Sequence, residues 1–185
     1  MQSLHLHLVL SRQNTSMQRR TKVKKIEANL RTCLQPAPKV IVSCRDSEGN
    51  NNALAVAYCC NCSYDPPMIM VGIVPSRHSY KIIKESGVFV VNVPSMEQKE
   101  IFDYLGSHSG RNEDKFASLS LKTQEGDVVN APLIHECPIC IECTVTASIL
   151  TGSHEMFVGK IEKIHVDEDL VNDKGNIDYS KIDQI

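Results

Sequence analysis

The 185-residue chain has no tryptophan, only five tyrosines and four phenylalanines, and no excess of either charge. Its 20 lysines and arginines are balanced by 22 aspartates and glutamates. Nucleic-acid-binding proteins usually carry a basic surface and aromatic side chains for base stacking, so the composition argues against that function. No apolar run approaches the roughly 20 residues of a membrane-spanning helix, so a membrane protein is not expected either. The length suits one domain.

The N-terminal segment is apolar in alternation at residues 4–10. It lacks the preceding positive region and the small-residue cleavage site of a signal peptide, so a cytoplasmic protein is expected. Residues 1–21 are predicted to form a disordered leader ahead of a single domain at residues 22–185.

Eight cysteines are present, most of them in two groups at residues 59–62 and 137–143. Side chains alternate along a strand, so Cys137 and Cys143 are expected on one face and Cys140 on the other. One metal ion cannot easily gather ligands from both faces. We therefore predict buried free thiols and no metal, and a structural metal or iron–sulfur site remains the alternative.

The pattern of apolar residues predicts strands alternating with short helices, and not a parallel doubly wound sheet. Strands are expected near residues 39–45, 53–62, 68–74, 88–93, 139–150 and 154–166. Helices are expected at 78–84, from a capping box at Ser95 to Leu105, and from Asn112, with a polar loop at 122–136. The last two strands are predicted to form an antiparallel hairpin around Gly152.

Ser76 and Arg77 stand between an apolar strand and a helical pattern. A helix N-terminus offers unpaired N–H groups and a partial positive charge, which favour a phosphate. Ser76 can cap the helix, and Arg77 can add a cation with a fork of donors. The alternative is a simple cap beside a solvated arginine.

Two further features accompany this candidate phosphate site. Asn92 lies inside the nearly continuous apolar strand 88–93, where an unpaired amide would cost about 1–3 kcal/mol. Either a ligand or the neighbouring backbone can satisfy it. Small residues at 53–57 would let a flat polar ring lie against the backbone of their strand, and tight sheet packing is the alternative explanation.

The ordered succession of these segments resembles the flavin reductase-like family, the FMN-binding split barrels that include the flavoredoxins. The resemblance spans residues 22–183, and no single motif in it is specific. Its matching segments are Pro38-Lys-Val-Ile-Val-Ser43, Asn52-Ala-Leu-Ala-Val-Ala57, Asp65-Pro-Pro67, Met70-Val-Gly-Ile73, Ser76-Arg77, Ser86-Gly-Val-Phe-Val-Val-Asn-Val93, Asp114-Lys-Phe116, Ile141-Glu-Cys143, Gly152-Ser-His154, Phe157-Val-Gly-Lys-Ile161 and His165-Val-Asp167. In relatives the pattern at residues 176–183 leads to a further tail, so a missing C-terminal tail is an open alternative.

The resemblance implies a mainly β fold, an FMN-binding split β-barrel of antiparallel, Greek-key-like strands with short flanking helices. It also implies noncovalent FMN at the interface of a homodimer. Strand residues 52–58 would line the flavin ring, and Ser76, Arg77 and Lys115 would hold the phosphate. The full set of expected cofactor-binding residues is Asn52, Ala53, Ala55, Val56, Ala57, Tyr58, Cys59, Ser76, Arg77, Tyr80, Asn92, Ser109 and Lys115.

Three functions stay open at this point. The first is an FMN-dependent reductase that takes electrons from NADH or NADPH and passes them to a small-molecule or protein acceptor. For this function the resemblance gives His154 the catalytic position, on the open side of the flavin near the nicotinamide. The second is a flavoredoxin-like electron carrier without its own nicotinamide site, and the third is a cysteine-based metal or redox protein. The chain has no Gly-rich dinucleotide fingerprint, which leaves nicotinamide use undecided.

Overall fold

The computed structural model of the protein describes residues 24–31 and 34–185. The chain divides into two units, residues 1–34 and 35–185. In the first unit the described residues are exposed and carry no helix or strand. The leader predicted at residues 1–21 lies outside the described residues. The second unit contains all the helices and strands discussed below.

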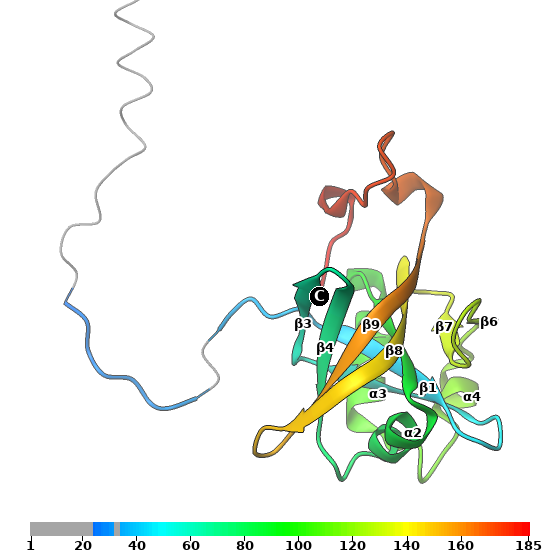
Figure 1. Ribbon diagram of the computed structural model, residues 1–185, viewed down its shortest axis with the longest axis horizontal. Helices are drawn as coiled ribbons and strands as arrows, with labels where there is room; N and C mark the ends of the chain where they lie inside the picture. The colour runs from blue at the N-terminus through cyan, green and yellow to red at the C-terminus, as the bar shows by residue number, and fades with distance from the viewer. Residues whose placement is uncertain (1–23, 32–33) are drawn as a thin grey trace, which may run out of the picture. The chain divides into compact units, whose positions relative to one another are not determined.

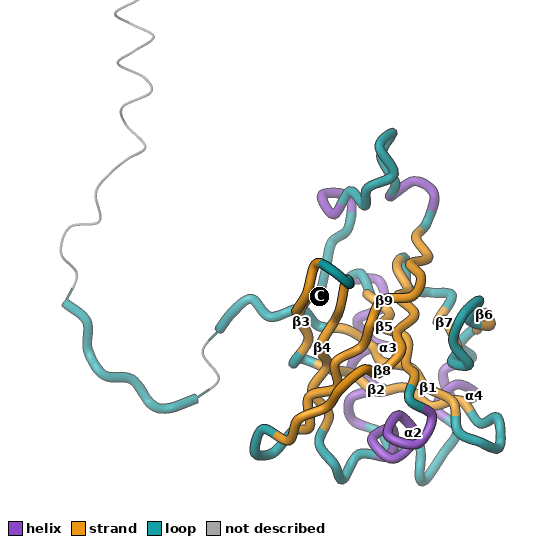
Figure 2. The backbone as a smooth tube through the Cα atoms, viewed as in Figure 1, coloured by secondary structure: helices purple, strands orange, loops and turns teal. Residues whose placement is uncertain are grey.

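Seven strands form one antiparallel sheet in the order β2-β1-β5-β8-β9-β4-β3 (Figures 1 and 2). Within the described residues no ladder joins the edge strands β2 and β3, so the barrel is not closed by backbone hydrogen bonds. Two short strands, β6 and β7, pair separately. The strands are β1 (Val40–Arg45), β2 (Asn51–Val56), β3 (Cys59–Tyr64), β4 (Pro67–Ile73), β5 (Val88–Val93), β6 (Thr123–Glu125), β7 (Pro132–Ile134), β8 (Ile139–Leu150) and β9 (Glu155–Val166).

Three α-helices flank the sheet: α2 (His78–Ser86), α3 (Lys99–Ser107) and α4 (Lys115–Leu119). Helix α2 packs on β1, while α3 and α4 pack on β2. The predicted capping box is confirmed: Ser95 and Gln98 cap the short 3₁₀ helix η1 (Met96–Gln98), which leads into α3. Two more 3₁₀ turns follow near the C-terminus, η2 (Glu168–Leu170) and η3 (Tyr179–Lys181). Helix α4 starts at Lys115 and not at Asn112, because the Asp114 carboxylate accepts from the first two free backbone N–H groups.

The buried strands were predicted well. Strands 88–93 and 139–150 have the predicted bounds, and the hairpin is confirmed, with Gly152 in the left-handed region at φ 96°. β5 is buried on both faces, since Phe89 and Val91 pack in one core cluster and Val90 in the other. Gly159 of β9 is needed for this packing, because a Cβ there would lie 2.6 Å from the Phe89 ring.

Two predicted elements were wrong. The strand expected at 53–62 is two strands, because β2 pairs with β1 and β3 pairs with β4 at the far edge of the sheet. The chain crosses between them at residues 57–58, and the run of small residues carries no turn residue to mark the crossing. The loop expected at 122–136 contains β6 and β7, whose three residues each are too short for a periodic pattern.

The cysteine arrangement also differs from the prediction. Cys137 precedes β8 and packs in the same core cluster as Cys140, while Cys143 packs in the other cluster. Strand alternation therefore does not apply to Cys137. Burial raises the pKa of Cys140 and of Cys143 to about 12, as expected for inert thiols. Among the described residues no cysteine belongs to a cluster able to hold a metal ion.

One group of potential metal ligands does occur, at Asp127, Glu142 and His165. Its atoms are already engaged: the buried Glu142 carboxylate accepts from three backbone N–H groups of residues 127–129, at 2.7–3.1 Å, and pairs with His165 at 2.6 Å. Asp127 pairs with Lys163. This group therefore fastens a loop to the sheet. No helix in the described part of the chain is long and apolar enough to cross a membrane.

Candidate functional site

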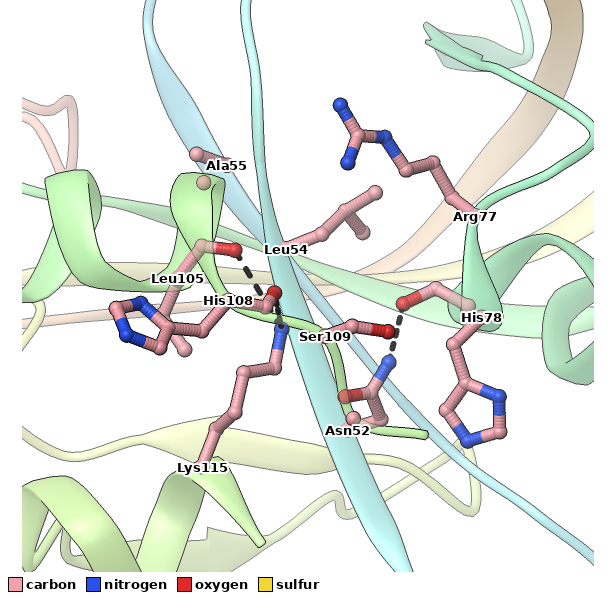
Figure 3. A pocket seen from close by; sticks show the side chains of 12 residues that line it. Asn52, Leu54, Ala55, Arg77, His78, Leu105, His108, Ser109 and Lys115 are labelled. Atoms are coloured by element: carbon pink, nitrogen blue, oxygen red, sulfur yellow. Dashed lines mark hydrogen bonds between the residues drawn. The ribbon is translucent and has the colours of Figure 1, made fainter. Parts of the chain in front are cut away.

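A small cavity of about 60 Å³ lies where β2, the start of α2 and the segment after α3 meet (Figure 3). Each of these elements contributes polar side chains or backbone to its wall. A second cavity of about 560 Å³ adjoins it and shares three lining residues, Asn52, His78 and Gly110. The lining of the small cavity is Asn52, Leu54, Ala55, Arg77, His78, Ser79, Leu105, Gly106, His108, Ser109, Gly110 and Lys115.

Arg77 is the N-cap residue of α2, with extended backbone angles of φ −73° and ψ 146°. Its side chain is exposed and makes no hydrogen bond or ion pair with any residue that the structure describes. The predicted role of Ser76 as cap is wrong, because Arg77 takes that position and no side chain caps the helix. The first N–H groups of α2 and a free guanidinium therefore stand together at the cavity.

Asn52 and Ser79 form the polar floor of the cavity. Both are nearly fully buried, and the Asn52 amide donates to the Ser79 hydroxyl at 2.6 Å (Figure 3). The loop after α3 runs directly over this pair, since a Cβ on Gly110 would lie 2.3 Å from the Asn52 amide oxygen. A larger residue at position 110 would therefore push the loop away from β2.

Lys115 contributes to the wall through a different arrangement. Its side chain is buried, and its ammonium donates to the backbone carbonyl of Ala53 and to those of Leu105 and His108, at 3.4 and 3.3 Å (Figure 3). Burial lowers the pKa of Lys115 to about 8. The family resemblance led us to expect that this ammonium binds a phosphate. In the structure it donates to backbone carbonyls instead.

Positive charge predominates around the small cavity. Burial, and then Arg111 and Lys115, lower the pKa of His78, so the imidazole is neutral at pH 7. The three carboxylates of the adjoining cavity are engaged elsewhere: Asp46 accepts from Asn50, Glu113 accepts from the Tyr104 hydroxyl, and Asp114 caps α4. An anion in the small cavity would therefore meet Arg77 and the helix terminus without a competing free carboxylate on its wall.

The structure brings together five of the thirteen residues predicted for the cofactor: Asn52, Ala55, Arg77, Ser109 and Lys115 line the small cavity. Four other predicted residues, in β2, in the crossing after it and at the start of β3, are placed differently. The Ala53 and Val56 side chains are in the two core clusters, Ala57 is exposed, and Cys59 packs against the core. These residues can offer a ligand mainly backbone groups.

Tyr58 and His154 form a separate pair, with ring centroids 4.7 Å apart and the rings at 75°. The His154 ring also lies 2.8 Å from the Ser153 hydroxyl. Neither residue lines the small cavity. Tyr58 lies at the crossing from β2 to β3, and His154 lies at the end of the β8–β9 hairpin. These two predicted residues therefore contact each other at a second location, separate from the small cavity.

Two residues predicted to bind the cofactor, Asn92 and Tyr80, make hydrogen bonds to other residues of the protein instead. The buried Asn92 amide donates to the Ser43 hydroxyl at 2.9 Å and the Ile41 carbonyl at 3.1 Å, and its oxygen accepts from the Ile134 N–H at 2.9 Å. The interpretation that the backbone satisfies this residue is therefore the correct one, and it does not line the small cavity. Tyr80 donates to the Glu155 carboxylate at 2.5 Å and stacks edge-on against Phe157.

Glu155 collects several donors besides Tyr80. Lys84 of α2 pairs with it, and Ser148 of β8 donates to it at 2.5 Å. Lys84 first, then Ser148 and Tyr80, lower the pKa of Glu155 to about 2. This cluster connects α2 to the hairpin.

Sequence reasoning predicted Ser109 but missed other residues of the cavity, notably His78, Ser79, Gly106, His108 and Gly110. One signal was available: Gly106-Ser-His-Ser-Gly110 places two glycines around three polar residues at the end of α3 and in the loop that follows it. Such a run is typical of a loop that approaches another strand closely. The contacts of Gly106 with Ala55 and of Gly110 with Asn52 are of this kind.

The fold and the site define a class of protein, an antiparallel split barrel with a small polar cavity and an exposed arginine at a helix N-terminus. The family model described as "Flavin reductase like domain" matches residues 33–180. The chain belongs to this family. The predicted mainly β, split-barrel fold is thereby confirmed, and the described strands show it as a curved sheet that does not close.

Individual relatives agree with this assignment. The chain is similar to the flavoredoxin of Desulfovibrio vulgaris (Miyazaki F), with a TM-score of 0.81 and 35% identity over 87% of this chain and 86% of that one. It is 37% identical over 117 residues to an uncharacterized protein of Archaeoglobus fulgidus, covering 63% of this chain and 66% of that protein. A match at 22% identity over 123 residues, 66% of this chain and 67% of the relative, is the NADH:riboflavin 5'-phosphate oxidoreductase of Streptomyces pristinaespiralis. The chain spans between 53% and 66% of the length of the first three curated relatives.

Proposed function

We propose that the protein is an FMN-dependent oxidoreductase that takes electrons from NADH or NADPH and passes them to an acceptor. The observation that carries the proposal is Arg77. Its guanidinium is exposed and has no partner among the described residues, and it stands at the N-terminus of α2 beside a small polar cavity. A phosphate is the group that this combination of donors and charge favours.

The residues that line the small cavity fit the phosphate of FMN and the adjoining part of the flavin side chain. The small cavity, about 60 Å³, is far below the roughly 300 Å³ at which ligand pockets begin, so it suits one end of a ligand. Ala55 and Gly106 have little or no side chain, so their two backbone segments approach closely in the wall of the cavity. β2 is an edge strand, so its outer backbone groups can pair with a flat polar ring. When bound, FMN supplies the hydride and electron chemistry.

The described chain contributes binding and orientation to this chemistry. Arg77 and the first N–H groups of α2 hold the phosphate, and Asn52 and Ser109 orient the adjoining polar chain. His154 and Tyr58 stand at the second place, where they position the nicotinamide and exclude water. Hydride transfer depends mainly on such positioning, and less on acid–base residues.

A test of this function is anaerobic reduction of the FMN-loaded protein. Mixed with NADH or NADPH, the yellow absorbance should disappear at a rate that saturates with nicotinamide concentration. His154→Ala should slow this reduction about tenfold and leave FMN affinity unchanged, because the histidine orients only the donor. His135→Ala, which removes an exposed histidine outside the site, is the control and should behave as the parent. A parent that binds no FMN would refute the proposal, and an H154A protein that loses FMN would make His154 a flavin ligand.

A flavoredoxin-like electron carrier is the second candidate, favoured by the 35% identity to a flavoredoxin. A carrier would be reduced slowly by both nicotinamides and quickly by a reduced ferredoxin-type donor. The same anaerobic experiment therefore separates the two functions. The metal form of the cysteine-based alternative finds no group of ligands among the described cysteines. For its redox form the chain offers two exposed thiols, Cys60 and Cys62, for which the prediction of burial was wrong.

We further propose that the protein is a homodimer and that it works in the cytoplasm. A reducing compartment suits the seven cysteines of the described part, all of which are free. The small cavity holds only one end of a flavin, and the exposed hairpin residues Ile149 and Leu150, 60% and 63% exposed, offer an apolar surface for a second copy. Light scattering at micromolar concentration should return twice the chain mass of 20.6 kDa, and a monomer would refute the dimer.

A further inference from the structure

Lys115 is unusual among the charged residues near the cavity because it is almost completely buried, at 3% exposure. A buried ammonium is costly unless its donors are satisfied. Lysine has three N–H donors and no acceptor, and here the three donors meet three backbone carbonyls. The ammonium therefore has no donor left for a ligand in the cavity.

The three carbonyls belong to the segments that form the walls. Ala53 lies in β2, Leu105 in the last turn of α3, and His108 is the C-cap of that helix. The C-terminus of a helix leaves carbonyls unpaired and carries partial negative charge, so a cation there is favourable. Lys115 thus ties the end of α3 and the following loop to the middle of β2.

This tie lies beside two close backbone approaches. A Cβ on Gly106 would lie 3.2 Å from Ala55, and one on Gly110 would lie 2.3 Å from Asn52. The loop between these glycines carries Ser109 and covers the polar floor. Among the described residues, the hydrogen bonds that connect residues 105–110 to β2 run through the Lys115 ammonium.

We infer that Lys115 is a positioning residue, whose ammonium fastens residues 105–110 to β2 and so keeps the flavin site in shape without touching the phosphate. This inference rests on the proposed function. It differs from the expectation drawn from the family resemblance, which placed Lys115 on the phosphate beside Arg77. In Figure 3 the Arg77 guanidinium lies near the top of the view, apart from the Lys115 ammonium, which lies lower down beside His108.

The charge state of Lys115 supports the same role. Burial lowers its pKa to about 8, while Cys44 of β1 and Glu113 of the α3–α4 loop act to raise it and Arg77 acts to lower it. Below pH 8 the ammonium supplies three donors, and above it the neutral amine supplies two, so one carbonyl loses its partner. Of the neighbouring groups, His78 has its pKa lowered from the ordinary value of 6.5, chiefly by burial, and Arg77 stays charged throughout this range.

The decisive measurement compares two flavins on two variants. Lys115→Met keeps the length of the side chain and removes its charge and donors. It should weaken FMN and riboflavin equally, by about tenfold, because the walls serve both ligands. Arg77→Ala should weaken FMN only. Lys122→Met, at an exposed lysine after α4, is the matched control and should change neither affinity. A loss confined to FMN in K115M would overturn the inference and make Lys115 a phosphate ligand.

Two further readouts test the tie, the first without a bound flavin and the second without a variant. Amide hydrogen exchange in the ligand-free protein should be faster at residues 106–110 in K115M than in the parent, and equal exchange would refute the tie. In the parent, riboflavin affinity should fall about two- to threefold between pH 7 and pH 9 as one donor is lost. A riboflavin affinity that does not change between pH 7 and pH 9 would contradict the positioning role of Lys115. If the parent binds neither flavin, the proposed function fails, and the exchange measurement still decides the role of Lys115.

Discussion

Replacing Arg77 with alanine should weaken FMN binding about thirtyfold and leave riboflavin binding almost unchanged. The reason is that the guanidinium, free of protein partners among the described residues, provides charge-assisted bonds to the phosphate. Such a bond contributes about 2 kcal/mol, which corresponds to that ratio of affinities. Fluorescence titration of the two flavins measures it, since riboflavin differs from FMN only by the phosphate.

The control for this variant is Lys81→Ala on the same helix. It removes the same charge from a side chain that is 78% exposed and does not line the cavity. If K81A weakens FMN as much as R77A, only the general charge of the helix matters and Arg77 has no direct contact. Equal losses of FMN and riboflavin in R77A would likewise remove the phosphate from this position.

The second large effect is on stability. Asn92→Ala should lower the free energy of unfolding by about 3 kcal/mol, because it leaves buried partners such as the Ile134 N–H and the Ser43 hydroxyl without their hydrogen bonds and opens a small cavity. Urea unfolding should show a lower midpoint with an unchanged slope. Asn61→Ala, at an exposed asparagine of β3, is the matched control and should cost less than about 0.5 kcal/mol.

The same variant also settles whether Asn92 belongs to the flavin site. FMN affinity per folded molecule should stay within about twofold of the parent, because the side chain faces β1 and β7 instead of the cavity. A tenfold loss of FMN affinity with an unchanged unfolding midpoint would return Asn92 to the list of cofactor residues.

The sequence predicted correctly those features that depend on residues close together in the chain. The bounds of β5, the hairpin and the capping box at Ser95 depend on neighbouring residues, and they were predicted correctly. Arg77 was placed at the start of a helix for the same reason. The partners of Asn92 and Lys115 could not be predicted, since Ile134 and Ala53 lie 42 and 62 residues away in the chain. A buried amide or ammonium looks the same in the sequence whether its partner is a ligand or a carbonyl.

The Glu155 cluster has a consequence for how the two ends of the site can move. Glu155 follows His154 directly, and its carboxylate is held by Lys84 and Tyr80 of the helix that Arg77 caps. The proposed phosphate end and the proposed nicotinamide end are therefore connected through one carboxylate. A displacement of the hairpin tip, by a docking protein or by a second copy, would be transmitted along α2 to the guanidinium, so contact at one end would change how tightly the cofactor is held at the other.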